Sequence, residues 1–164
     1  MSNTMDISEI APRLRRDIQG AIQSEVFKVC EQTLRKEIMR GVYQSYTPTT
    51  YNRTYSFLNA VAIKNVHIGS SEATFDVVID SSKFDYINPA PGAPRFGAWG
   101  SHVGFSHQHF SEGLIDALEN GKGSSWFTHP AGHFFENTEK NLEQRIPFLL
   151  VSALRARGWD AQIE

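Results

Sequence analysis

Residues 134–159 read FFENTEKNLEQRIPFLLVSALRARGW and carry one apolar stripe at helical spacing. The stripe repeats at intervals of three, four or seven residues: Phe135, Leu142, Ile146, Leu149, Ala153 and Ala156. Pro147 is expected to kink this helix or to split it, and Gly158 is suited to end it. An amphipathic helix of this kind needs an apolar partner surface elsewhere in the chain.

Two helical segments are predicted before residue 47. Asp6 and Glu9 resemble a capping box, which indicates a short N-terminal helix or arm over residues 1–20. A stronger helix is predicted over residues 21–46, where apolar positions are spaced by four: Ile22, Val26, Cys30, Leu34, Ile38 and Val42. Charged residues away from the stripe are interpreted as a solvated face, and Glu37 is the exception because it falls close to the stripe.

The middle of the chain predicts a β-hairpin within residues 58–80. Its strands are Val61–Ile68 and Ala73–Asp80, and a change of phase near Lys64 and Asn65 indicates a bulge. An extended loop rich in proline and glycine follows over residues 81–104. A short helix is predicted over residues 112–120, with a strand as the alternative. The expected fold is a single α+β domain over residues 1–164, an antiparallel sheet packed against two long amphipathic helices.

Composition narrows the classes of function. The chain has 164 residues and a formal net charge of −2, so nothing in its overall charge favours nucleic acid or an anionic membrane. Its one cysteine, Cys30, cannot form an intrachain disulfide and lies on an apolar helical face. We expect no signal peptide and no membrane span, because no apolar run approaches about 20 residues.

Histidines provide the main candidate for a chemical site. His107, His109, His129 and His133 could together hold zinc, which would make the chain a metal-dependent hydrolase. Pro130 and Gly132 make the segment around the last pair a poor helix, and the zinc-protease pattern is absent. Asp76, Asp80 and Asp85 are interpreted as solvated carboxylates. The preferred prediction is therefore no catalytic residue, no metal and no cofactor.

Two segments are candidates for contacts with a partner. The first follows the helix of residues 21–46, and the second is the extended loop. Tyrosine, tryptophan, phenylalanine and arginine are enriched where protein interfaces are strongest. The predicted subunit or partner contacts are Tyr46, Tyr51, Arg53, Tyr55, Arg95, Phe96 and Trp99. A protein-binding adaptor with no other role is the third hypothesis.

Two sequence segments resemble segments of the tail-completion, or head–tail joining (neck), proteins of long-tailed bacteriophages. The first is VYQSYTPTTYNRT at residues 42–54, directly after a Glu-rich helix. The second is PAGHFFENT at residues 130–138, followed by a helix that closes in LRARGW at residues 154–159. A hairpin and a glycine-bearing loop lie between them, so the resemblance covers about residues 25–159.

The resemblance implies a structural virion protein without an active site, made in the host cytoplasm. Such a protein would assemble as a ring between the capsid connector and the tail. Its expected partners are copies of itself, the head–tail connector, and the tail terminator or tail-tube proteins. DNA would pass through the ring transiently, and low basicity suits such a channel because tight pairing with phosphates would hold the DNA back.

Overall fold

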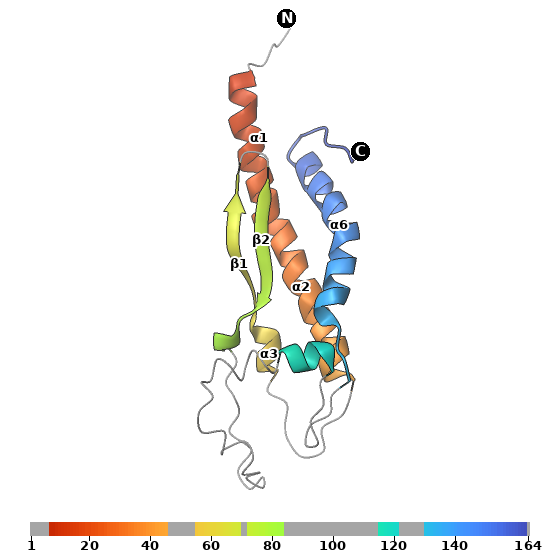
Figure 1. The fold of residues 1–164 in the computed structure, drawn as a ribbon. Coiled ribbons are helices and arrows are strands. Elements are labelled where there is room, and N and C mark those ends of the chain that lie inside the picture. Colours follow the sequence, from red (N-terminus) through yellow and green to blue (C-terminus); the bar gives the residue numbers. More distant parts are fainter. Residues whose placement is uncertain (1–6, 46–54, 70–71, 84–114, 122–129, 164) are drawn as a thin grey trace, which may run out of the picture.

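The computed structural model describes residues 7–45, 55–69, 72–83, 115–121 and 130–163. It is mixed α and β, with an antiparallel sheet and long helices near both ends of the chain, which confirms the predicted α+β class. A long helical spine lies between a β-hairpin on one side and a second long helix on the other (Figure 1).

The spine is continuous from Ile7 to Tyr43. It consists of α1 (Ile7–Ala21), a π-helical turn η1 (Ile22–Val26), α2 (Phe27–Ile38) and a second π-helical turn η2 (Met39–Tyr43). The predicted division near residue 20 is therefore wrong. A glycine inside a helix costs only about 1 kcal/mol, and the buried stripe of Ile22, Val26 and Cys30 carries the helix past Gly20.

The hairpin has the predicted strands and the predicted bulge. Strand β1 (Val61–Ile68) pairs antiparallel with β2 (Ala73–Ile79), and the register shifts between Lys64 and His67. Asn65 adopts a positive φ of 51° at this point, a conformation that asparagine tolerates better than most residues. Two short elements that were not predicted flank the hairpin: α3 (Ser56–Asn59) and the 3₁₀ turn η3 (Ser81–Lys83).

Helix α6 (Phe134–Ala156) packs along the spine opposite the hairpin (Figure 1). It passes through Pro147 as one element, so a split into two helices is wrong. The proline side chain is exposed there. Within the described residues, 115–120 form a helix rather than the alternative strand, and Gly121 ends it with a φ of 67°.

The core has two apolar clusters along the spine. One centres on Leu34, Ile38 and Phe134, all fully buried, and the other surrounds Val26, Cys30 and Leu142. Both clusters combine side chains of the spine, the hairpin and α6. The predicted stripe of residues 22–42 is buried in these clusters, whereas the stripe predicted for α6 is confirmed only in part: Leu142 and Ala153 are buried, Ala156 is exposed, and the fully buried Phe134 was not in it.

Two polar contacts tie the end of α6 to the spine. The Nη1 atom of Arg157 lies 2.9 Å from Oε1 of Glu25, and the indole Nε1–H of Trp159 donates to Oδ2 of Asp17 at 2.8 Å. Residues 158–163 follow α6 at this end of the molecule, close to α1 in Figure 1.

Candidate interaction groove

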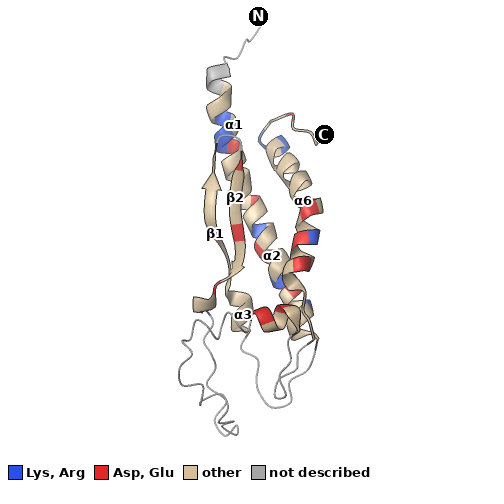
Figure 2. Ribbon diagram, in the orientation of Figure 1, with Lys and Arg blue, Asp and Glu red and all other residues tan. Residues whose placement is uncertain are grey.

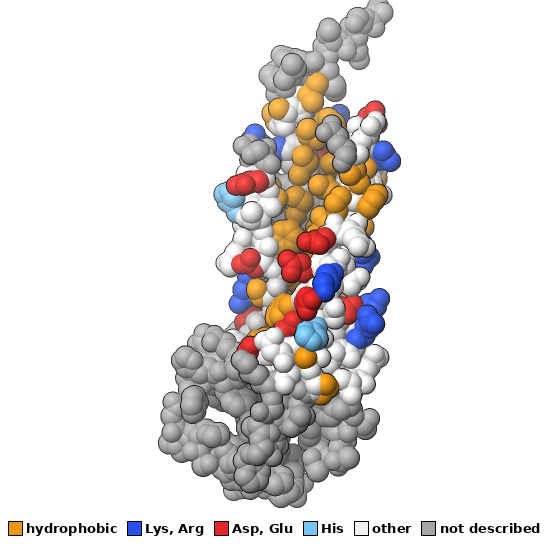
Figure 3. Space-filling model, turned by 45° about the vertical axis from the view of Figure 1, so that its right-hand side comes forward, with side chains coloured by type: hydrophobic (Ala, Val, Ile, Leu, Met, Phe, Trp, Pro, Cys, Tyr) orange, Lys and Arg blue, Asp and Glu red, His pale blue; other side chains and the backbone are white. Residues whose placement is uncertain are grey.

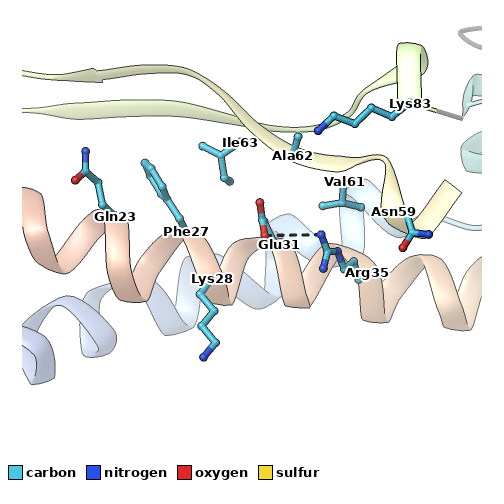
Figure 4. A pocket seen from close by; sticks show the side chains of 10 residues that line it. All are labelled: Gln23, Phe27, Lys28, Glu31, Arg35, Asn59, Val61, Ala62, Ile63 and Lys83. Carbon is cyan, nitrogen blue, oxygen red and sulfur yellow. Dashed lines mark ion pairs between the residues drawn. The ribbon is translucent and has the colours of Figure 1, made fainter. Parts of the chain in front are cut away.

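An open groove runs between α2 and β1, on the side of the spine that Figure 4 shows. Its volume is about 590 Å³. Apolar and polar side chains alternate along it, and Glu31 projects toward β1 between Phe27 and Arg35 (Figure 4). The lining residues are Gln23, Phe27, Lys28, Glu31, Arg35, Asn59, Val61, Ala62, Ile63 and Lys83.

The aromatic ring of Phe27 supports the groove from the helix side. Its centroid lies 4.8 Å from the ring of Phe75 on β2, at an interplanar angle of 59°. This contact joins the spine to the inner face of the hairpin. Ile63 remains partly exposed beside it, so a bound molecule would meet apolar surface between two firmly packed elements.

The rim of the groove is positively charged. It carries three cationic side chains, Lys28, Arg35 and Lys83, against the single carboxylate of Glu31, a local net charge of +2. Glu31 pairs with Arg35 along the helix at 3.8 Å. In Figure 4, Lys83 extends over the strand, whereas Lys28 points away from it at the outer rim. The groove therefore suits a ligand that combines apolar and acidic groups.

Strand β1 forms one wall of the groove with its backbone edge. In the described part of the chain the sheet has two strands, so β1 pairs on one side with β2 and its other edge has no strand partner. The bulge after Lys64 limits the regular part of this edge to residues 61–64. Such an edge can accept an added strand through main-chain hydrogen bonds.

A second surface lies on the face that Figure 3 shows. Hydrophobic side chains form a band there, and acidic side chains gather below it (Figure 3). Apolar residues around the second core cluster remain only partly buried: Ile18, Ile68, Ala73, Phe75, Ile146 and Leu150. In Figure 2, α1 carries basic residues with an acidic residue beside them, and the first half of α6 carries acidic and basic residues side by side.

One of the predicted contact residues can be placed. Tyr55 is 45% exposed, has a φ of 56°, and stacks on Tyr43 with the ring centroids 4.8 Å apart. It packs at the lower end of the spine rather than in the groove. The others lie outside the described residues and stay predictions: Tyr46, Tyr51, Arg53, Arg95, Phe96 and Trp99.

Of the four histidines considered as zinc ligands, the structure describes one. His107, His109 and His129 lie outside the described residues. His133 is exposed, and its Nδ1 atom lies 3.4 Å from Oε2 of Glu136. Among the described residues, no three side chains of histidine, cysteine, aspartate or glutamate are grouped closely enough to hold a metal ion.

Two other groups have shifted pKa values. Burial raises the pKa of the Cys30 thiol to about 11, so it is protonated near neutral pH and is a poor nucleophile. Asp80 accepts hydrogen bonds from the Ser82 hydroxyl at 2.6 Å and from Lys64, with Nζ at 3.0 Å, and its pKa is lowered to about 2. Cys30 lies in the apolar core and Asp80 is bonded to its neighbours in the hairpin, so neither group faces the groove.

Sequence reasoning missed the groove because its walls are distant in the chain. Lys28 was assigned to a solvated face, and nothing in the helical pattern shows that β1 and Lys83 lie beside it. The available signal was the hairpin itself: a two-stranded sheet on one side of a long helix leaves strand edges and helix flanks next to each other.

The fold and this groove together define a small α+β protein with an open groove between a long helix and a β-hairpin. A family model named YomN matches residues 6–156, which is most of the chain. The chain therefore belongs to the YomN family, and the family name indicates a phage-associated protein.

The other comparisons add no relative. No curated protein and no solved structure matches this chain. Within the described ranges, no helix is both long enough and apolar enough to cross a membrane.

Proposed function

We propose that this chain is a structural protein of a phage neck, where it joins the capsid connector to the tail as part of a ring of identical subunits. In this role it has no catalytic residue, metal or cofactor. Its partners are copies of itself, the head–tail connector, and the tail terminator or tail-tube proteins. DNA passes the ring transiently, and the assembled protein is located in the virion.

The observation that carries the proposal is the edge of β1 beside the groove, which has no strand partner among the described residues, in a chain of a phage-associated family. A ring forms when one surface of a subunit binds a different surface of the next and the rotation closes. The groove provides one such surface, and the partly exposed apolar side chains around the second cluster provide another.

Charge supports the same role. The net charge of −2 gives the chain no general attraction to phosphate, which suits a subunit beside passing DNA. Charges of both signs lie on each helix: α1 has three arginines with Glu9 and Asp17, and the first half of α6 has three glutamates with Lys140 and Arg145 (Figure 2).

The mass of the purified chain in solution tests the self-assembly. Light scattering over a range of protein concentrations is expected to give a discrete multiple of the subunit mass of 18.5 kDa. A subunit mass at every concentration would contradict spontaneous ring formation. Metal analysis of the same sample tests the hydrolase hypothesis, since one tightly bound zinc per chain would favour it over the neck proposal.

A further inference from the structure

We infer that Phe148 of one copy of this chain docks on the apolar band of a second copy. The band consists of partly buried residues of the spine, the hairpin and α6: Ile18, Ile68, Ala73, Phe75, Ile146 and Leu150. This inference rests on the self-assembly in the proposed function and names the two surfaces that meet. Exposure, position along α6 and charge argue for it.

Phe148 is the most exposed large apolar side chain among the described residues, with 67% of its surface accessible. It lies on α6 beside the exposed Pro147. Aromatic side chains are frequent anchors of protein interfaces. Burial of such a ring in a contact strengthens association by about tenfold to a hundredfold, so Phe148 has burial to gain from a partner.

The band of its own subunit is out of reach of Phe148. Ile146 and Leu150 each lie two residues from Phe148 along α6, which places them about 200° around the helix from it. Both pack against the second core cluster, whereas Phe148 is exposed. The ring of Phe148 can therefore meet a band only on another copy.

The positions along α6 suit subunits that stand side by side in a ring. Rotation about an axis parallel to α6 leaves the height of every residue unchanged. Phe148 lies midway between Ile146 and Leu150 along the helix, so it meets the neighbour's band between these two side chains. The contact joins two different surfaces at one height, and such a contact can repeat and close.

Charges beside the two surfaces are complementary. Arg145 lies one turn from Phe148, and Glu143 lies one turn from Ile146 of the band. Both are exposed, and neither forms an ion pair within the described part of the chain. Their heights along α6 differ by about 3 Å, so Arg145 of one copy can pair with Glu143 of the next.

Charge also favours the band over the groove between α2 and β1 as the site for Phe148. Arg145 and Arg155 flank Phe148 on the exposed side of α6. The side chains that line the groove have a local net charge of +2, so like charges would meet there. Docking on the band leaves the groove available for a different partner.

Light scattering of two single variants tests the contact. Phe148→Ser is expected to raise the protein concentration at which half of the chain is assembled by about tenfold or more. Val66→Ser is the matched control, because Val66 is also apolar and 45% exposed but lies at the bulge of β1, outside the band. It is expected to change this concentration by less than about twofold. Circular dichroism checks that each variant is folded.

Charge reversal tests which side chains meet. Arg145→Glu and Glu143→Arg are each expected to raise the concentration for half assembly by about threefold or more, since like charges then face each other. The two changes in one chain restore opposite charges across the contact. The doubly changed chain is therefore expected to assemble within about twofold of the wild-type concentration.

A mixture of two blocked variants tests the head-to-tail arrangement. Phe148→Ser keeps the band but lacks the ring, whereas Ala73→Arg keeps the ring and places a charge in the band. Each variant alone is expected to be a monomer. An equimolar mixture is expected to form a dimer, with twice the subunit mass of 18.5 kDa, because one contact can form and the next cannot.

The outcomes separate this inference from the proposed function. Assembly of Phe148→Ser at the wild-type concentration, or a mixture that stays monomeric, would overturn the docking. If the wild-type chain assembles in that case, its self-assembly stands and uses another surface. A wild-type chain that is a monomer at every concentration would overturn the docking and the spontaneous ring together, and the role in joining heads to tails is then decided by phage particles that lack the chain.

Discussion

At the scale of single residues, Gly20 and Gly41 lie in the same long helix and have opposite surroundings. A Cβ atom on Gly41 would overlap the carbonyl oxygen of Gly132 and lie 2.9 Å from its Cα. A Cβ on Gly20 would meet nothing nearer than the side chain of Arg157, at 3.9 Å. The spine and the start of α6 therefore approach each other at Gly41 through backbone alone.

The two substitutions to alanine are expected to have opposite signs. Gly20→Ala should raise the free energy of unfolding by about 0.5–1 kcal/mol, since alanine favours helix. Gly41→Ala gains the same propensity, but overlap with backbone costs about 1–3 kcal/mol and should give a net loss. Urea denaturation of both variants measures the difference, and a stabilised Gly41→Ala would show that the close approach is wrong.

Asp80 is expected to contribute to the acid stability of the hairpin. Its folded pKa is about 2 against an ordinary value of 3.8, so the carboxylate stabilises the fold above pH 3.8 and this contribution is lost as the pH falls toward 2. Asp80→Asn should remove that part of the decrease in unfolding free energy between pH 4 and 2, roughly the window set by the two pKa values. Ser82→Ala, which removes one donor, should reduce the decrease in part. An unchanged decrease in Asp80→Asn would refute the assignment.

At the scale of elements, Glu119 caps a helix that is distant in sequence. Its carboxylate accepts hydrogen bonds from the backbone N–H groups of Phe135 at 3.1 Å and Glu136 at 3.4 Å. Gly132 and His133 donate in turn to the carbonyls of Leu118 and Glu119. These bonds satisfy free donors at the start of α6 and fix the helix of residues 115–120 against it.

Removal of this cap is expected to loosen the start of α6. Glu119→Ala should lower the free energy of unfolding by about 1 kcal/mol and speed amide exchange in residues 134–138. Glu139→Ala, an exposed acidic position on α6, is the control and should change stability by less than about 0.5 kcal/mol. If both variants had equal stability and exchange, Glu119 would not act as the cap.

The elements themselves were largely predictable. The spacing of four between Ile22, Val26 and Cys30 predicts the helix of the spine, and these residues are buried in it. The change of phase at Lys64 and Asn65 predicts the bulge, which the register shift confirms. Pro147 was misleading, because a proline on an exposed helix face loses one hydrogen bond without ending a helix that is held by buried neighbours. Glu37, 3% exposed, was correctly singled out by its place near the stripe.

Long-range contacts could not be predicted in the same way. The cap of α6 by Glu119 and the groove lined by both Lys28 and Lys83 join residues from different elements. Periodicity reports which face of an element is buried, but it carries no information about which edge of a hairpin lies beside which flank of a helix. The groove could therefore be recognised only in the structure. The contact residues predicted from the sequence, such as Tyr55, were chosen by residue type and by the family resemblance.

At the scale of the whole molecule, the subunit is elongated, with the hairpin and α6 on opposite sides of the spine (Figure 1). Among the described residues, the β1 edge beside the groove has no strand partner, and the side chains that line the groove have a local net charge of +2. A head-to-tail contact joins two different surfaces and leaves the same pair of surfaces free for the next copies. Repetition of that contact around an axis would produce the ring that the neck proposal requires.

Electron microscopy of particles from a phage that lacks this chain tests the neck role most directly. If the chain joins head to tail, we expect filled heads and finished tails that remain separate, and joined particles again when the chain is supplied from a plasmid. Joined, infectious particles in its complete absence would contradict the proposed role in head–tail joining.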